Sequence, residues 1–328
     1  VKAAAADVVI DGTNVTANEA GTATNKDKAA IIFLHGLGDV SLFDIRIPTH
    51  EAFLLSALAG TQTPDGWSKL LPEALPTYRP NLANVDITYV FPPAQNVGIT
   101  VNGGEQMPAW FDIFDWPLGV DAKDDPKGLA MSVKRIEKIV AELTDEEGID
   151  PSRVVLGGFS QGGAVALMAA YNRRKKDAVP FAACACMSGY LPLKTYLDVS
   201  EGAAKDTPLF WAHGEHDDKI LFEQFVYGVE KLESAGVSVT ACSYPVGHES
   251  SNFKEIDDFA AFLEDVLCAD EATADEMSKS AKAEAGGQTA PLLDDDEKNA
   301  VLYYLLAGDA DNEAVESSTQ ESMPMETR

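Results

Sequence analysis

The sequence predicts an α/β fold in which helices cover both faces of a mostly parallel sheet. Short apolar segments typical of buried strands recur along the chain, and segments with helical patterns lie between them. Parallel strands need such crossover connections, whose helices then cover both faces of the sheet. A third observation is Ser160, which lies between two pairs of glycines where a predicted strand meets a predicted helix.

The predicted elements alternate between about residue 29 and residue 268. Strands are expected at 31–34, 83–94, 153–159, 181–189, 208–214 and 238–245, and helices at 128–148, 163–171 and 221–236. The first of these helices has apolar residues at the spacing of one buried helix face, namely Leu129, Val133, Ile136, Ile139, Val140 and Leu143.

Ser160 is the candidate nucleophile. Residues 158–162 read Gly-Phe-Ser-Gln-Gly, which fits the pattern G-x-S-x-G. In this pattern a strained strand-to-helix turn holds an exposed serine hydroxyl at the carboxyl end of a strand, where open α/β sheets bind ligands. The alternative is a purely structural turn, but the strand before it and the helix after it favour a nucleophile.

A nucleophilic serine needs a base, for which histidine is the usual choice. Catalytic residues around such a turn follow the chain order serine, acid, histidine. Only His248 follows both Ser160 and an acid at another strand end, so it is the predicted base. The alternative for His248 is an ordinary surface loop residue. The chain has five histidines: His35, His50, His213, His216 and His248.

The acid should lie between Ser160 and His248, after another strand. The loop after the strand at 208–214 offers Glu215, Asp217 and Asp218. One of them would accept the Nδ1 proton of the histidine and stabilise the imidazolium that forms. The spacing alone does not separate the three.

Two backbone N–H groups are expected to stabilise the oxyanion. One belongs to Gln161, which follows the nucleophile and opens its helix. The other should come from an early loop after a strand, where Leu37 in "LHGLGD" is the candidate. The alternative for this loop is an ordinary strand-to-helix turn.

Six ordered segments of the chain resemble those of acyl-protein thioesterases and related small carboxylesterases and lysophospholipases. They are "FLHGLGD", "MPAWFDI", "GGFSQGG", "MSGYLPL", "HGEHD" and "YPVGHES". The resemblance runs from about residue 29 to residue 267 and implies a single α/β-hydrolase domain with a Ser-Asp-His triad, no cofactor and no metal. Carried over by position, the catalytic residues are Ser160, Asp217 and His248, with Leu37 and Gln161 as oxyanion donors.

The resemblance selects Asp217 among the three acids, because the family pattern is H-G-x-x-D. It also places Trp110 and Tyr190 near the expected active site as candidate substrate contacts, although core packing is an equally good interpretation of both. In one departure, Asp218 stands where the family commonly has proline. Two neighbouring carboxylates would raise the pKa of one of them.

The resemblance implies a serine hydrolase of acyl thioesters or esters that works through an acyl-enzyme. Protein S-depalmitoylation is the predicted function, with S-acylated proteins as substrates. The first alternative is a general carboxylesterase or lysophospholipase that acts on acyl esters or lysophospholipids. The second is a non-catalytic binding protein with a hydrolase fold.

Composition limits the partners. The formal charge of −28 over 328 residues argues against binding of nucleic acid and of anionic lipid by simple electrostatics. No apolar run reaches the roughly 18 residues of a transmembrane helix, which leaves transient access to a membrane surface as the predicted contact with lipid. The four cysteines show no zinc spacing and favour a reducing compartment, so a cytoplasmic location is predicted. Nothing in the sequence indicates an oligomeric state.

The predicted organisation has three parts. Residues 1–28 form an N-terminal arm, residues 29–268 the hydrolase domain, and residues 269–328 an acidic, largely disordered tail with one short helix near 294–307. Residues 40–65 are an insertion relative to the family. A short helix at 49–60 within it would carry four large apolar side chains, which predicts a lid or pocket wall for long acyl chains. The alternatives are a peripheral helix packed away from the site and a segment retained from a misread gene.

Overall fold

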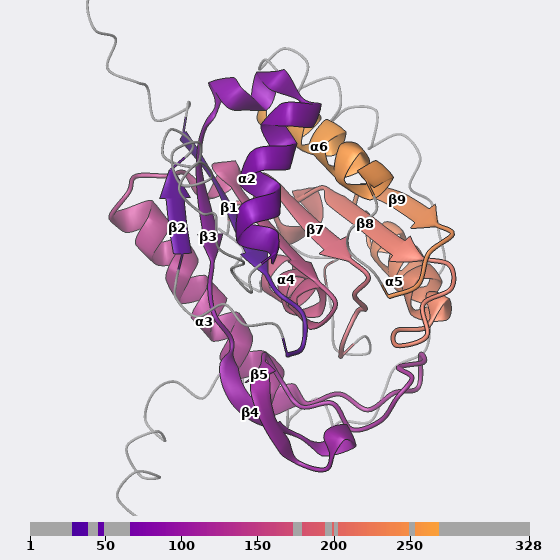
Figure 1. The fold of residues 1–328 in the computed structure, drawn as a ribbon. Helices are drawn as coiled ribbons and strands as arrows, with labels where there is room; N and C mark the ends of the chain where they lie inside the picture. The colour runs from indigo at the N-terminus through magenta and orange to yellow at the C-terminus, as the bar shows by residue number, and fades with distance from the viewer. Residues whose placement is uncertain are drawn as a thin grey trace, which may run out of the picture.

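The computed structural model describes residues 28–38, 45–48, 66–172, 179–193, 199, 203–248 and 253–268. The described residues form a seven-stranded sheet and a separate two-stranded hairpin (Figure 1). The strand order is β2-β3-β1-β6-β7-β8-β9, and every neighbouring pair is parallel except β2 with β3. The predicted fold, a mostly parallel sheet with helices, is confirmed.

The predicted strands and helices occur in the predicted order, and the structure adds β2, β4, β5, α2 and α6, which were not predicted. The sheet strands are β1 (Lys28–Leu34), β2 (Ile45–Pro48), β3 (Asp86–Phe91), β6 (Val154–Phe159), β7 (Ala183–Met187), β8 (Leu209–Gly214) and β9 (Val239–Tyr244). The hairpin strands are β4 (Gln95–Ile99) and β5 (Glu105–Ala109). The α-helices are α2 (Gly66–Tyr78), α3 (Pro126–Asp145), α4 (Gln161–Tyr171), α5 (Phe222–Ser234) and α6 (Phe253–Leu267). Short 3-10 helices lie at Pro80–Asn84, Thr100–Asn102, Pro151–Arg153 and Ala203–Asp206.

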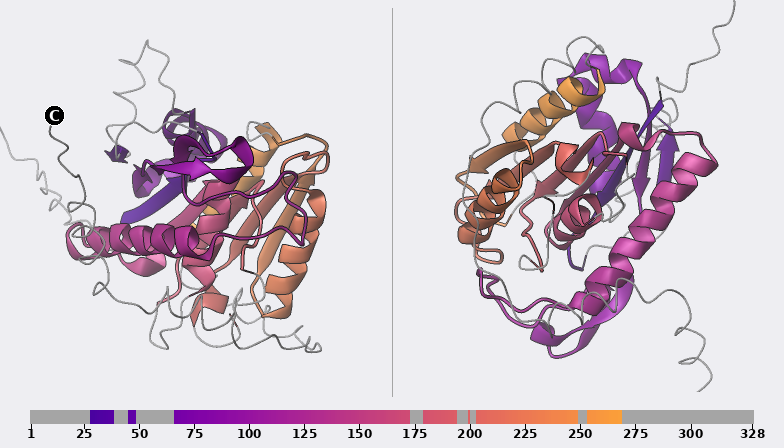
Figure 2. Two further views of the ribbon diagram at one scale, coloured as in Figure 1. Left: turned by 90° about the horizontal axis from the view of Figure 1, so that it is seen from below. Right: turned by 180° about the vertical axis from the view of Figure 1, so that it is seen from behind.

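Helices lie on both faces of the sheet (Figures 1 and 2). Successive strand residues point to opposite faces, so Ile32 of β1 belongs to the core that includes residues of α3, α4 and α5, whereas Ile31 belongs to the core that includes residues of α2 and α6. Both side chains are fully buried. Because each face carries its own apolar core, β1, β7 and β8 are buried along nearly their whole length rather than on alternate residues.

The sequence of α3 explains where this helix begins and which of its faces is buried. It begins after Asp125, whose Oδ1 accepts the N–H of Gly128 at 3.0 Å, and Pro126 occupies its first turn. A carboxylate cap and an early proline are both favourable at this end of a helix. The six predicted apolar residues of this helix are all buried.

The hairpin of β4 and β5 extends the fold at the carboxyl edge of the sheet. Pro108 in β5 accepts the N–H of Gly38 at 2.9 Å, which joins the hairpin to the loop that follows β1. Figure 1 shows the hairpin below the main sheet. Gly103 and Gly104 make its turn with φ values of 70° and 85°, which favour glycine. This hairpin is absent from the sequence-based predictions.

The structure describes only β2 within the predicted insertion at 40–65. Ile45 pairs with Phe91 and Pro48 pairs with Thr88, so β2 is an antiparallel edge strand that runs away from the carboxyl edge of the sheet. The sequence predicted no strand at this place. The helix expected at 49–60, the lid, residues 1–27 of the N-terminal arm and the tail at 269–328 lie outside the described residues, while Lys28 opens β1. In the described part of the chain, no helix is long and apolar enough to cross a membrane.

Candidate active site

Ser160 stands at a tight turn between β6 and α4. Its φ of 56° and ψ of −120° lie in a region that non-glycine residues rarely adopt. A Cβ added at Gly158 would lie 2.4 Å from the carbonyl carbon of Gly162, and one added at Gly162 would lie 2.1 Å from the carbonyl oxygen of Leu34. The glycines around Ser160 therefore let β6, α4 and the end of β1 approach closely.

The expectation that the serine is exposed on its turn is wrong, because Ser160 is only 5% exposed. The loop after β1 lies against it, since a Cβ added at Gly36 would be 3.5 Å from Ser160 Cβ. His248 covers it from another side, as its Nε2 lies 2.9 Å from Ser160 Oγ.

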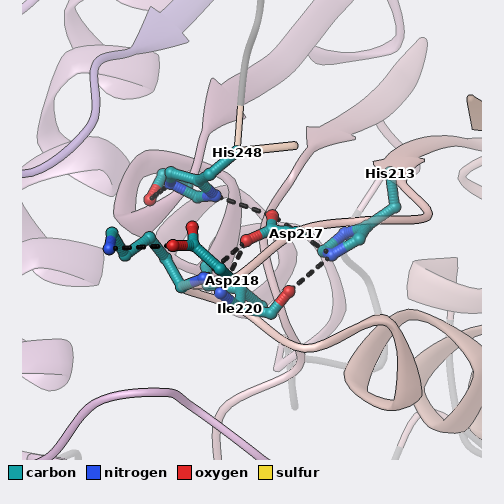
Figure 3. A network of polar contacts seen from close by, with 7 residues as sticks. His213, Asp217, Asp218, Ile220 and His248 are labelled. Atoms are coloured by element: carbon teal, nitrogen blue, oxygen red, sulfur yellow. Dashed lines mark hydrogen bonds and ion pairs between the residues drawn. The ribbon is translucent and has the colours of Figure 1, made fainter. Parts of the chain in front are cut away.

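The structure brings Ser160, His248 and Asp217 into one hydrogen-bonded chain. His248 Nε2 is 2.9 Å from Ser160 Oγ, and His248 Nδ1 is 2.7 Å from Asp217 Oδ2 (Figure 3). The three residues follow β6, β9 and β8. They meet because parallel strands place their carboxyl ends at one edge of the sheet.

Asp217 is held as a carboxylate. Its Oδ1 accepts the N–H groups of Lys219 and Ile220, both at 2.8 Å. Burial by itself raises the pKa of Asp217, but the contacts with His248 and these two N–H groups outweigh it, so the pKa lies below its usual value. An ionised carboxylate only accepts hydrogen bonds, so Nδ1 of His248 carries the proton and Nε2 faces Ser160 with a lone pair.

Asp218 turns away from Asp217 (Figure 3). Its side chain is 76% exposed and lies 3.3 Å from Lys219 Nζ. The two neighbouring carboxylates therefore do not share a site, although Asp218 replaces the proline that the family pattern has here.

Leu37 and Gln161, the expected oxyanion donors, flank Ser160 in different ways. Gln161 is the first residue of α4, whose opening N–H groups have no partner within the helix. Leu37 follows Gly36, which packs against Ser160. Neither N–H group is hydrogen-bonded to another part of the described chain. No described residue therefore competes for these two N–H groups, and their role as oxyanion donors stays a prediction.

Trp110 is buried and holds the loop after β1. It is 3% exposed, and its indole N–H donates to the carbonyl of His35 at 2.9 Å. The side chain of Gln161 binds the backbone of residues 110–111. Its Oε1 accepts the N–H of Trp110 at 2.9 Å, and its Nε2 donates to the carbonyl of Phe111 at 2.6 Å. The sequence did not reveal this use of the glutamine side chain. Contact between Trp110 and substrate stays a prediction.

Tyr190 is also 3% exposed and packs edge-on against Phe111, with ring centroids 6.4 Å apart. Burial, followed by the charges of Asp124 and Asp125, raises the pKa of Tyr190, which therefore keeps its hydroxyl proton. These packing contacts do not bear on its predicted contact with substrate, which stays a prediction.

The other histidines have different surroundings. His35 accepts the N–H of Ala94 on Nε2 at 3.0 Å and contacts the carbonyl of Gly36 through Nδ1 at 2.8 Å, so protein groups occupy both ring nitrogens. His216 is exposed and His50 lies outside the described residues. His213 is buried beside Asp217, a contact that the sequence did not reveal. No group of three or more His, Cys, Asp or Glu within the described ranges is arranged to hold a metal ion.

A family model described as phospholipase/carboxylesterase matches residues 75–267. The chain belongs to this family. The predicted relationship to acyl-protein thioesterases and carboxylesterases, the α/β-hydrolase fold and the prediction of a hydrolase are thereby confirmed. The family match covers α3 through α6, and so includes Ser160, Asp217 and His248.

Curated relatives and solved structures agree with this assignment. Acyl-protein thioesterase 1 of Yarrowia lipolytica is 32% identical over 244 residues, which cover 72% of this chain and 91% of the relative. Acyl-protein thioesterase 1 of Gibberella zeae is 31% identical over 247 residues, covering 74% and 92%. Among crystal structures, SOBER1 of Arabidopsis thaliana has 26% identity and a TM-score of 0.57, covering 73% of this chain and 99% of that one. Acyl-protein thioesterase 2 of Zea mays has 26% identity and a TM-score of 0.54, covering 73% and 94%.

Proposed function

We propose that this member of the phospholipase/carboxylesterase family is a serine hydrolase that cleaves acyl thioesters and esters, with S-acylated proteins as its main substrates. The observation that carries the proposal is the hydrogen-bonded chain from Ser160 through His248 to the ionised Asp217. It supplies a nucleophile, a base and an orienting carboxylate in one geometry.

The reaction follows from this geometry. Ser160 Oγ attacks the acyl carbonyl while His248 Nε2 takes its proton, and Asp217 stabilises the resulting imidazolium. The carbonyl electron pair moves to oxygen, where the N–H groups of Leu37 and Gln161 bind it. One such donor contributes about 2.7–4 kcal/mol to transition-state stabilisation. His248 then protonates the leaving thiol or alcohol, and water repeats the sequence on the acyl-enzyme.

The names of the relatives support a thioester substrate, because both curated relatives above are acyl-protein thioesterases. A cysteine thiol with a pKa of about 8.5 leaves more easily than an alkoxide, so a site that cleaves esters also cleaves thioesters. The family description supports the second candidate, a carboxylesterase or lysophospholipase.

We also propose a cytoplasmic location. Its support is that Cys184, Cys186, Cys242 and Cys268 are all free thiols. Unpaired cysteines are typical of reducing compartments.

Labelling with an alkyl fluorophosphonate tests the catalytic proposal. The folded wild-type protein should react, and Ser160→Ala should not. Its kcat should fall below about a thousandth of the wild-type value, since loss of a triad member exceeds that factor. Ser234→Ala, an exposed serine at the end of α5, is the matched control and should label normally. A folded wild-type protein that does not label would support the non-catalytic binding protein instead.

A substrate panel tests the choice of substrate. It compares a palmitoylated peptide, a lysophospholipid, and acetyl and long-chain esters by kcat/KM. The palmitoylated peptide should give the highest value. A higher kcat/KM on the lysophospholipid or on a simple ester would replace the depalmitoylase with the second candidate.

A further inference from the structure

A second buried histidine lies on the side of Asp217 opposite His248 (Figure 3). His213, near the end of β8, is 1% exposed. Its Nε2 lies 2.9 Å from the carbonyl oxygen of Ile220 and 3.4 Å from Asp217 Oδ2. The Asp217 carboxylate is therefore placed between two imidazole rings, one of which has no part in the proposed reaction.

The His213 ring is a neutral donor. A carbonyl oxygen only accepts hydrogen bonds, so Nε2 carries the proton and donates it to Ile220. The other nitrogen, Nδ1, is buried with no partner among the described residues. Burial lowers the pKa of His213, with a smaller contribution from His248, although the Ile220 carbonyl and Asp217 both act in the opposite direction. Because the His213 ring is neutral, it does not compete for the negative charge of Asp217, which stabilises the imidazolium of His248.

Ile220 links this ring to the carboxylate. Its carbonyl accepts the proton of His213, and its N–H donates to Asp217 Oδ1 at 2.8 Å. The same turn is fixed on its other side, because Leu118 N–H donates to the carbonyl of Lys219 at 2.7 Å.

The ring of His213 is itself held in place. It stacks on Phe225 of α5, with centroids 5.7 Å apart and an interplanar angle of 26°. Phe222 lies against it with centroids 6.2 Å apart. A rotation of the imidazole would break this packing as well as its bond to Ile220, so the ring is a rigid support for the turn at 217–220.

We propose that His213 is a positioning residue that holds the turn at 217–220 through the carbonyl of Ile220, and thereby keeps Asp217 aligned with His248. The inference rests on the proposed function, because alignment matters only if Asp217 assists His248. His213 does not touch the reacting atoms, so its removal should lower kcat and leave KM nearly unchanged.

Three substitutions of His213 separate the effect of its N–H donor from the effect of its packing. His213→Phe keeps an aromatic ring beside Phe225 and removes the N–H, and should lower kcat about 10- to 100-fold, the effect of a small misplacement of a catalytic group. His213→Gln keeps an amide N–H of similar reach and should restore kcat to within about 3-fold of wild type. His213→Asn, whose shorter amide does not reach Ile220, should behave as His213→Phe. His216→Gln, an exposed histidine of the same loop, is the control and should change nothing.

A double-mutant cycle with Asp217→Asn distinguishes positioning from a general structural role. If His213 acts through Asp217, His213→Phe should cost less than about 2-fold in kcat when Asp217 is already replaced. Rates are compared per folded molecule, with folding followed by near-UV circular dichroism. Equal losses in both backgrounds, or wild-type kcat in both His213→Phe and His213→Asn, would overturn the inference. An inactive wild-type protein would instead overturn the proposed function.

Discussion

Replacing Glu255 with glutamine should remove a large pH-dependent loss of stability. Glu255 lies in the first turn of α6, is 2% exposed, and its Oε1 has no hydrogen-bond partner in the part of the chain that the structure describes. Burial raises the pKa of this carboxyl from 4.5 to about 8. At neutral pH the side chain is therefore protonated in the folded protein and ionised in the unfolded chain.

The size and sign of the effect follow from proton binding. Between pH 4.5 and about 8 the folded protein keeps a proton that the unfolded chain releases, so the free energy of unfolding falls as the pH rises. The slope approaches about 1.4 kcal/mol per pH unit. Integrated from about pH 5 to pH 8, the loss is about 3.5 kcal/mol, a large share of the roughly 5–15 kcal/mol that stabilises a typical domain. Glutamine has a similar shape and no proton to lose.

Urea denaturation of both proteins at about pH 5, 6.5 and 8 measures this difference. The free energy of unfolding of Glu255→Gln, relative to wild type, should increase by about 3.5 kcal/mol over that range. Asp265→Asn removes an exposed carboxylate from the same helix and should show a nearly constant difference. A constant difference for Glu255→Gln as well would show that Glu255 is ionised in the folded protein and refute the reasoning.

Three further predictions concern catalysis. Asp217→Asn should lower kcat about 10⁴-fold. Asp218 is an exposed carboxylate paired with lysine, so Asp218→Asn should keep kcat within about 2-fold of wild type. The reverse order would identify Asp218 as the acid. Gly162→Ala would place a Cβ 2.1 Å from a backbone oxygen of β1. It should lower kcat about 100- to 1,000-fold by displacing the loop after β1, which carries the predicted oxyanion donor Leu37. Gly66→Ala, with nothing within 4 Å of the added atom, is its control, and equal kcat in both variants would contradict this account. If residues 49–65 contact long acyl chains, polar substitutions of Phe53, Leu54, Leu55 and Leu58 should lower kcat/KM for long-chain esters and leave kcat/KM for acetyl esters unchanged. Equal effects on both substrates would reject the lid.

Several features of the chain could be predicted because their causes are local. The buried face of α3 follows from apolar residues spaced at one helix period. The turn at Ser160 follows from glycines that leave room for close backbone contacts. Motif order along the chain named His248, and the resemblance to a known family selected Asp217 among three acids. The structure places His248 in contact with Ser160 and Asp217 in contact with His248.

The hairpin of β4 and β5 and the edge strand β2 could not be predicted, because these strands form by pairing with another strand. Strands β4 and β5 each begin with two exposed polar residues and end with three less exposed residues, so their sequence carries little apolar alternation, although Gly103 and Gly104 mark their turn. Strand β2 has only four residues and gains its hydrogen bonds from β3, which lies about forty residues further along the chain. Such strands exist only where a partner strand is already in place.

By itself, the sequence predicted the α/β fold, six strands of the main sheet and three of its helices, and the candidate serine and histidine, since local periodicity, steric limits and motif order specify them. The acid was selected by the resemblance to a known family. Only the tertiary structure decided that His213 contacts the carbonyl of Ile220, that the Gln161 side chain accepts the N–H of Trp110, and that burial raises the pKa of Glu255. These contacts join residues on different elements, and their energies depend on burial and on distances of a few ångströms. No spacing along a single chain segment encodes those quantities.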